Sequence, residues 1–268
     1  MSVLKAPETG RFYDKNGNCQ LTVPKADGKG ERDPTITDAR KNHWYPSVNE
    51  VLKRLASPEL DMWKVEHLID TARQRPQNVG ESDEDYIKFI YEASKEYVTL
   101  AASMGKDIHA DLFEFFINGK VPTSTVSLKA CQNVQKILEE YKVTLVRGET
   151  SFCNTILGWA GRSDMDADTK TGGTILIDFK TTTEKSLKEL KWAYYKSGLQ
   201  LAGYRLGKIM DDRAACLNIH ISRETGSVRC YNWCSNESPY SVSDLGVAFG
   251  ALFTEWCISN KYDPRKAA

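Results

Sequence analysis

The sequence predicts an α/β protein whose helical first half leads into a sheet. Apolar residues recur at helical spacing over residues 82–118. Further along, the run Thr174–Ile177 is apolar and β-branched, as in strands that are buried on both faces. Short apolar runs then alternate with helical patterns as far as residue 259. With 268 residues, the chain is long enough to bury one sizeable core.

The first predicted elements are a polar arm and a set of helices. Residues 1–45 are rich in Gly, Pro, Lys and Asp, which predicts an arm or a loose hairpin with little core. Ser47 is placed to cap a short helix, and Glu50 follows at capping-box spacing. A second helix begins near residue 57 and a long one covers 82–118, with 73–80 as a linker and Gly119 as the stop. The side chains expected to face inward from the second helix are Leu60, Trp63, Val65 and Leu68.

The second half of the chain carries the predicted sheet. After a helix over 128–141, we expect strands over about 144–153, 157–167 and 174–180. A helix over 186–208 follows, then strands near 215–223 and 227–234 and a last helix over 242–259. We therefore predict an N-terminal arm over 1–45 and a single domain over 46–268. Within this domain, 46–143 is helical, 144–234 holds the sheet with its helix, and 235–268 holds the C-terminal helix.

Composition restricts the location and the partners of the protein. An apolar content of 41% with 27% charged residues is ordinary for a globular protein. No apolar run approaches the roughly 18 residues of a membrane span, and the N-terminus lacks a signal-peptide core. We therefore expect a cytoplasmic protein without a membrane partner. Because 36 basic residues balance 36 acidic ones, any binding to DNA requires a local basic patch.

Residues 158–180 carry most of the functional information. Side chains at i and i+2 of a strand share one face, so Asp178 and Lys180 point together while Phe179 points to the opposite layer. A carboxylate and an ammonium at the end of a buried strand are costly unless something compensates them. With the second carboxylate of Asp164 nearby, a divalent cation is the natural compensation. The pattern predicts a metal-dependent site that holds a phosphodiester and activates water.

The segment G-R-S-D-M-D-A-D offers three carboxylates for this site. Asp164, Asp166 and Asp168 alternate onto one face of a continuous strand. Asp166 is the reserve candidate, while Asp168 fits the following turn. Which of the first two is the ligand stays open from spacing alone.

Four motifs together resemble the RecB-type branch of the PD-(D/E)XK nuclease superfamily, which includes phage and mitochondrial single-protein exonucleases. They are Asp164 followed by Asp178-x-Lys180, the upstream Gly105-x-x-x-His109, the downstream Gln200-x-x-x-Tyr204, and the opening Pro46-Ser47-Val48 with Val51-Leu52 and Leu60-x-x-Trp63. The resemblance covers about residues 46–208. It implies a restriction-endonuclease-like core, in which a central mixed β-sheet is flanked by helices and preceded by an α-helical part.

The resemblance also implies an activity and a set of roles. The activity is that of a metal-dependent DNA nuclease, an exonuclease of replication, recombination or repair that leaves a 5′-phosphate and a 3′-hydroxyl. The implied metal is Mg²⁺, with Mn²⁺ as a substitute, held by His109, Asp164, Asp178 and the backbone carbonyl of Phe179. Lys180 would orient or deprotonate water or stabilise the transition state. The implied partners are DNA, single-stranded or with free ends, and replication or recombination proteins of a bacterial or phage-infected cell.

Other residues have both a functional and a structural interpretation. Gln200 and Tyr204 share a helix face, where they would either contact Lys180 and phosphate or simply pack. The remaining candidates for substrate binding are Glu149, Thr181, Thr182, Lys191 and Trp192. For the threonines the alternative is helix capping, and for Lys191 and Trp192 it is a solvated face and the core.

Seven scattered cysteines show no C-x-x-C pair, so we expect reduced thiols and no iron–sulfur cluster. Two alternatives to a nuclease stay open. One is a non-catalytic DNA-binding module of the same fold, and the other is an unrelated protein in which D-x-K is coincidental.

Overall fold

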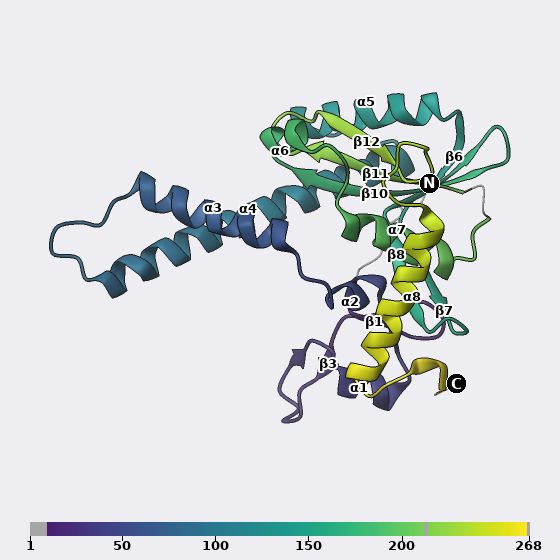
Figure 1. Ribbon diagram of the computed structural model, residues 1–268, viewed down its shortest axis with the longest axis horizontal. Coiled ribbons are helices and arrows are strands. Elements are labelled where there is room, and N and C mark those ends of the chain that lie inside the picture. The colour runs from purple at the N-terminus through teal and green to yellow at the C-terminus, as the bar shows by residue number, and fades with distance from the viewer. Residues whose placement is uncertain (1–9, 212–213, 267–268) are drawn as a thin grey trace. The chain divides into compact units, whose positions relative to one another are not determined.

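The computed structural model describes residues 10–211 and 214–266, and the chain divides into two compact units (Figure 1). The first unit is built from residues up to Arg54 together with those from His109 onward. The second unit is Leu55–Ile108. The long helix α4, Asp83–Asn118, begins in the second unit and ends in the first.

The centre of the first unit is a mixed five-stranded sheet in the order β12-β11-β10-β9-β6. The strands β10 (Thr174–Thr182) and β11 (Ala215–Ser222) run parallel. Antiparallel pairing adds β9 (Met165–Thr169), β6 (Val143–Arg147) and β12 (Val228–Asn232). The run Ile175–Ile177 is almost completely inaccessible, as its composition predicts for a strand covered on both faces.

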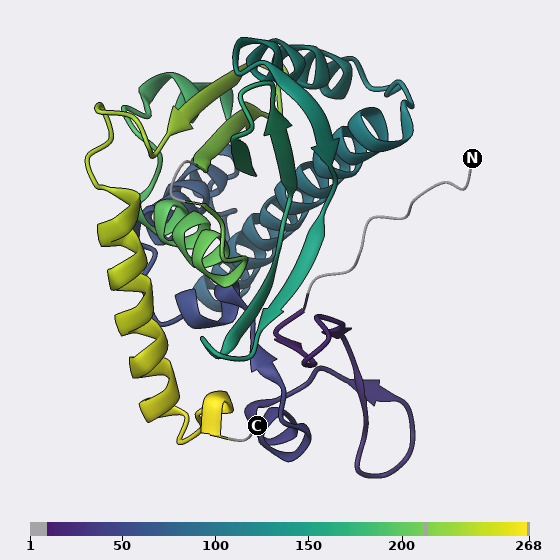
Figure 2. The ribbon, with the colours of Figure 1, turned by 90° about the vertical axis from the view of Figure 1, so that its right-hand side faces the viewer.

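Helices flank this sheet on both sides. Figure 1 shows α5 (Thr125–Glu140) along one side and α7 (Tyr195–Gly207) along the other. The helix α8 (Val242–Ser259) runs beside α7, away from the sheet (Figure 2). A central mixed sheet flanked by helices is therefore confirmed, and α8 has the bounds that the sequence predicts. The single predicted helix over 186–208 is instead two helices, α6 (Glu184–Glu189) and α7, separated by a non-helical segment with a bend.

Two of the predicted strands are each divided into two. The expected strand over 144–153 breaks between β6 and β7 (Thr150–Asn154) at Gly148, where a Cβ would lie 2.6 Å from the ring of Phe113. The expected strand over 157–167 breaks at Asp164, between β8 (Trp159–Ser163) and β9. The chain changes sheet at this point, because β8 pairs with β7 while β9 pairs with β10 and β6.

The N-terminal segment contributes more to the core than its polar composition predicts. The strands β1 (Phe12–Tyr13), β2 (Cys19–Gln20) and β5 (Tyr45–Pro46) form a small sheet, beside the pair β3 (Val23–Pro24) and β4 (Glu31–Arg32) and the helix α1 (Ile36–Asn42). Phe12 and Tyr13 are buried, so the expectation of little core is wrong. A few aromatic residues are enough to anchor an otherwise polar segment, because each buries a large apolar area.

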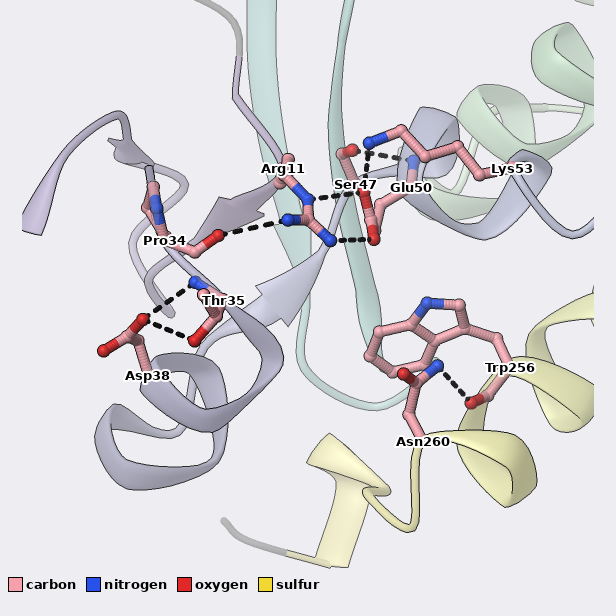
Figure 3. A network of polar contacts seen from close by, with 9 residues as sticks. All are labelled: Arg11, Pro34, Thr35, Asp38, Ser47, Glu50, Lys53, Trp256 and Asn260. Carbon is pink, nitrogen blue, oxygen red and sulfur yellow. Dashed lines mark hydrogen bonds and ion pairs between the residues drawn. The ribbon is translucent and has the colours of Figure 1, made fainter. Parts of the chain in front are cut away.

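A polar network ties this segment to the helix α2, Val48–Leu52 (Figure 3). Ser47 caps α2 and accepts a hydrogen bond from the backbone N of Glu50 at 3.0 Å, as predicted. The Glu50 carboxylate does not complete the capping box. It accepts two hydrogen bonds from Arg11, at 2.7 and 2.9 Å, and one from Lys53. The long-range Arg11–Glu50 pair therefore holds the N-terminal segment against α2.

The second unit is a pair of helices, α3 (Pro58–Gln74) and the first part of α4. Its internal contacts include the rings of Trp63, His67 and Tyr97 and the ion pair of Arg75 with Glu81. Leu60 and Val65 are exposed, so the expectation that they face inward is wrong. In a pair of helices, each helix buries only one narrow apolar stripe. Apolar residues outside that stripe remain exposed. Among the residues that the structure describes, no helix is long and apolar enough to cross a membrane.

Candidate active site

The second half of β10, from Asp178 onward, brings the residues of the D-x-K motif together. Asp178 is buried, and its Oδ2 lies 2.6 Å from Nζ of Lys180 on the same face of the strand. Phe179 points into the opposite layer, where it is buried. Nζ of Lys180 also donates to Oε1 of Gln200 on α7, at 2.9 Å. The ammonium is therefore held between a strand carboxylate and a helix amide.

Gln200 and Tyr204 continue this chain of hydrogen bonds along α7. Nε2 of Gln200 donates to the hydroxyl of Tyr204 at 2.9 Å. This bond fixes the amide so that its oxygen faces Lys180. Both side chains are buried, and their i, i+4 spacing places them on one helix face as the sequence predicts.

The neighbouring strand supplies a residue that sequence analysis missed. Asn218 is in register with Asp178 on β11, and its Nδ2 donates to Oδ2 of Asp178 at 2.8 Å. Its own Oδ1 accepts from Nε1 of Trp233 at 2.6 Å. In the sequence, Asn218 and His220 alternate with apolar residues of a buried strand. Because buried polar side chains need hydrogen-bond partners, this pattern could have indicated that Asn218 belongs to a polar site.

Asp164 reaches the site from the bend between β8 and β9. Its Oδ2 accepts a hydrogen bond from the backbone N of Phe179 at 2.8 Å. Nδ1 of His109, near the end of α4, lies 3.8 Å from the same oxygen. The His109 ring meets the ring of Phe179 edge-on, with centroids 6.0 Å apart. Residues from three distant segments therefore meet beside the second half of β10.

Burial and charge shift the titration of this cluster. Burial raises the pKa of Asp178, the nearby Lys180 opposes this rise, and the Asp164 carboxylate adds to it. Burial likewise lowers the pKa of His109, against the attraction of Asp164. Two interacting carboxylates and a neutral imidazole are a set of groups that a cation would stabilise.

Glu149 and Arg162 form an ion pair that belongs to the same neighbourhood. Nη1 of Arg162 lies 2.7 Å from Oε2 of Glu149, and both side chains are about nine-tenths buried. Burial raises the pKa of Glu149 to about 7, opposed by Arg162 and assisted by Asp164. Arg162, two residues before Asp164, was not among the predicted residues. The only signal for it was its place in the G-R-S-D segment.

The other two aspartates of that segment lie elsewhere. Because the chain changes sheet at Asp164, the expectation that all three aspartates share one strand face is wrong. Asp166 is paired with Nζ of Lys208 at 2.6 Å and accepts hydrogen bonds from Thr150 and Ser163. Asp168 forms a partly exposed ion pair with Arg147. Because of this bend, Asp164 lies beside Phe179. Asp166, the reserve candidate, instead forms a separate buried ion pair with Lys208.

We expect Asp166→Asn to destabilise the fold, because it leaves the Lys208 ammonium buried without a counter-charge. The expected cost is about 3 kcal/mol, at the low end of what breaking a buried pair costs. The matched control is Asp168→Asn, whose partly exposed pair is worth about 1 kcal/mol or less. Urea unfolding of both variants measures the difference. Equal, small losses in both would contradict the buried-pair interpretation.

The predicted substrate-binding residues Thr181, Thr182, Lys191 and Trp192 have different surroundings. Thr181 and Thr182 are the last residues of β10 and are partly buried, while the next residue, Thr183, caps α6 by accepting from the backbone N of Ser186. Lys191 is exposed. Trp192 packs edge-on against Tyr231 and Trp233, at centroid distances of 5.6 and 6.0 Å.

The donor atoms beside the second half of β10 are chemically suited to Mg²⁺ or Mn²⁺. Carboxylates, a carbonyl and an imidazole are ligands that these ions accept. Within residues 10–211 and 214–266, no three His, Cys, Asp or Glu side chains are close enough to one another to hold an ion. At the candidate site, Oδ2 of Asp178 contacts Nζ of Lys180 and accepts a hydrogen bond from Asn218.

Comparison with solved structures gives matches of low similarity, of which two are described in turn. No family model and no curated protein matches the chain. The crystal structure of SSO0001 matches with a TM-score of 0.30 and 13% identity, over 72% of this chain and 86% of that one. A "Putative exonuclease" from Eubacterium rectale matches with a TM-score of 0.35 and 13% identity, over 56% of this chain and 66% of that one. Likenesses at this level do not assign a family or a function.

Proposed function

We propose that this protein is a metal-dependent DNA nuclease of the RecB-type PD-(D/E)XK branch that hydrolyses phosphodiester bonds as an exonuclease. The observation that carries the proposal is one set of contacts around Asp178, Phe179 and Lys180 of β10. Lys180 lies between Asp178 and Gln200, and Gln200 donates a hydrogen bond to Tyr204. Asp164 accepts a hydrogen bond from the backbone N of Phe179, between Asp178 and Lys180. Taking an ammonium and two carboxylates partly out of water costs free energy. A purely structural role would not explain why the protein keeps these charged groups together in a half-buried cluster.

The residues that would hold Mg²⁺ or Mn²⁺ are Asp164, Asp178 and His109, with the backbone carbonyl of Phe179. Asp164 and His109 already lie 3.8 Å apart at their nearest polar atoms. A bound ion supplies a water of lowered pKa and neutralises charge on the phosphate. The neutral form of His109, which burial favours, is the form that binds metals.

Lys180 acts on the attacking water or on the charge that develops on the phosphate. Its Nζ is directed by Gln200, whose amide is in turn fixed by Tyr204. Release of Asp178 from Lys180 would free one ammonium hydrogen for the substrate while the Gln200 bond keeps the side chain in place. An ammonium held in this way stabilises charge without reorganising at the moment of reaction.

We propose that the physiological substrate of the protein is DNA with a free end, in replication, recombination or repair. The test is degradation of end-labelled DNA with Mg²⁺ and, separately, with excess EDTA. We expect degradation with Mg²⁺ and none with EDTA. Retention of DNA without Mg²⁺-dependent degradation would favour the non-catalytic DNA-binding module, and full activity in EDTA would remove the metal from the proposal.

A further inference from the structure

Two cysteine side chains meet beside the end of β12, and neither belongs to the contacts described above. Cys216 lies on β11 and is completely buried, while Cys234 follows β12 and is exposed. The backbone N of Trp233 donates to the carbonyl of Cys216 at 2.9 Å, so the chain around Cys234 runs directly beside β11. Both cysteines are free thiols in this structure.

Several contacts hold the sulfur of Cys234 against Cys216. The Cys234 Sγ donates to the carbonyl of Ala214, two residues before Cys216, at 3.5 Å. The thiol of Cys216 is a hydrogen-bond partner of the Cys234 sulfur, and so is the backbone N of Cys216. The side chain of Asn232 accepts from the backbone N of Cys234 at 2.9 Å, which fixes the turn that carries Cys234. The two sulfurs are therefore neighbours that no covalent bond joins.

The chemical state of these two sulfurs differs from that of three other cysteines. Burial raises the pKa of Cys131, Cys153 and Cys230 to about 12, which keeps these thiols protonated and unreactive. At Cys234 the hydrogen bond from Cys216 lowers the pKa, against the effect of burial. The same hydrogen bond, together with burial, raises the pKa of Cys216 well above its usual value. An exposed thiolate therefore lies beside a buried thiol that keeps its proton.

We propose that Cys234 and Cys216 form a thiol pair that reacts with hydrogen peroxide, in which the exposed Cys234 is oxidised first and Cys216 then closes a disulfide with it. This inference does not rest on the proposed nuclease function. A purely structural role, in which both cysteines pack as small apolar residues, would explain the burial of Cys216. It would not explain why Cys234 is exposed and hydrogen-bonded to Cys216.

The oxidation takes place in two steps. In the first, the Cys234 sulfur attacks one oxygen of the peroxide, the O–O bond breaks, and a sulfenic acid and one water are formed. In the second, the Cys216 sulfur attacks the oxidised Cys234 sulfur, the S–O bond breaks, and a second water leaves with the Cys216 proton. In total, the two thiols lose two electrons and two protons, and one peroxide is reduced to two waters.

The experiment treats the reduced protein with a slight molar excess of hydrogen peroxide at neutral pH and blocks the remaining thiols with iodoacetamide. Peptide mass spectrometry of the wild type then identifies the oxidised residues. We expect a disulfide that links the peptides of Cys216 and Cys234 within one chain, and dithiothreitol should restore both thiols. Without peroxide, iodoacetamide should alkylate Cys234 at least about 10-fold faster than Cys230, because the thiolate is the reactive form.

Three variants separate the roles of the two cysteines. Cys216→Ser keeps a hydroxyl donor for Cys234 but cannot form the disulfide, so the sulfenic acid of Cys234 should accumulate and be captured by dimedone. Cys234→Ser should leave Cys216 reduced at the same peroxide dose. Cys230→Ser is the matched control, since it removes a partly buried thiol from β12, and it should form the same disulfide as the wild type.

The wild-type peptide map decides the proposal even where a variant fails to fold. Two results would overturn it: both thiols staying reduced at a dose that oxidises an equal concentration of free cysteine, or a Cys234 disulfide that joins two chains. Alkylation of Cys234 no faster than that of Cys230 would also contradict it, because the thiolate beside Cys216 would then be absent.

Discussion

Lys180→Ala is expected to lower turnover by about 100-fold or more while DNA binding is largely retained. The substitution leaves Asp164, Asp178 and His109 in place and removes the ammonium that Gln200 directs. Loss of a group that stabilises the transition state lowers the rate without an equal loss of ground-state binding. Removing one such fixed donor typically costs about 100- to 1,000-fold. Single-turnover degradation and anisotropy measure the two quantities separately.

Two further variants sharpen this prediction. Lys180→Arg should not rescue turnover, because a guanidinium is larger and cannot give up a proton. Lys136→Ala, which removes an exposed lysine on α5, should behave like the wild type. Near-normal turnover in Lys180→Ala would remove the central residue from the proposed mechanism.

Asp164→Asn and Asp178→Asn should each abolish cleavage with little loss of stability. An amide of the same shape keeps the packing, but it removes a negative ligand from the proposed metal site. Burial raises the pKa of Asp178, which means that its charged form is unfavourable in the fold. Asp178→Asn removes this unfavourable charge, and this gain offsets the loss of the ion pair with Lys180. Cleavage assays and melting temperatures of both variants test this.

Asp168→Asn is the matched control on the same segment, since Asp168 pairs with Arg147 away from Lys180. It should cleave DNA at the wild-type rate. An active Asp164→Asn variant would show that the bend between β8 and β9 has been assigned the wrong role.

Much of this arrangement could be predicted because it depends on local periodicity. The alternation of a strand places Asp178 and Lys180 on one face, and the turn of a helix places Gln200 and Tyr204 together. The structure brings both pairs into one chain of hydrogen bonds. The last predicted helix, 242–259, has the same bounds as α8.

The remaining features depend on contacts that local patterns do not contain. Asp166 was the reserve candidate beside Asp164 until the change of sheet at residue 164 separated them. Asn218 faces Asp178 only because β11 pairs with β10 in parallel, across 40 positions of sequence. The burial of Phe12 likewise depends on a long-range neighbour, as does the ion pair of Arg11 with Glu50.

In the proposed mechanism, the cluster around Lys180 activates water to attack a phosphodiester. The most direct measurement is digestion of a DNA oligomer with Mg²⁺ in water enriched in oxygen-18, followed by mass spectrometry of the products. We expect one labelled oxygen in each new 5′-phosphate, an unlabelled 3′-hydroxyl, and loss of both products in Lys180→Ala. Products with a 3′-phosphate, or the same products from Lys180→Ala at the wild-type rate, would contradict the claim.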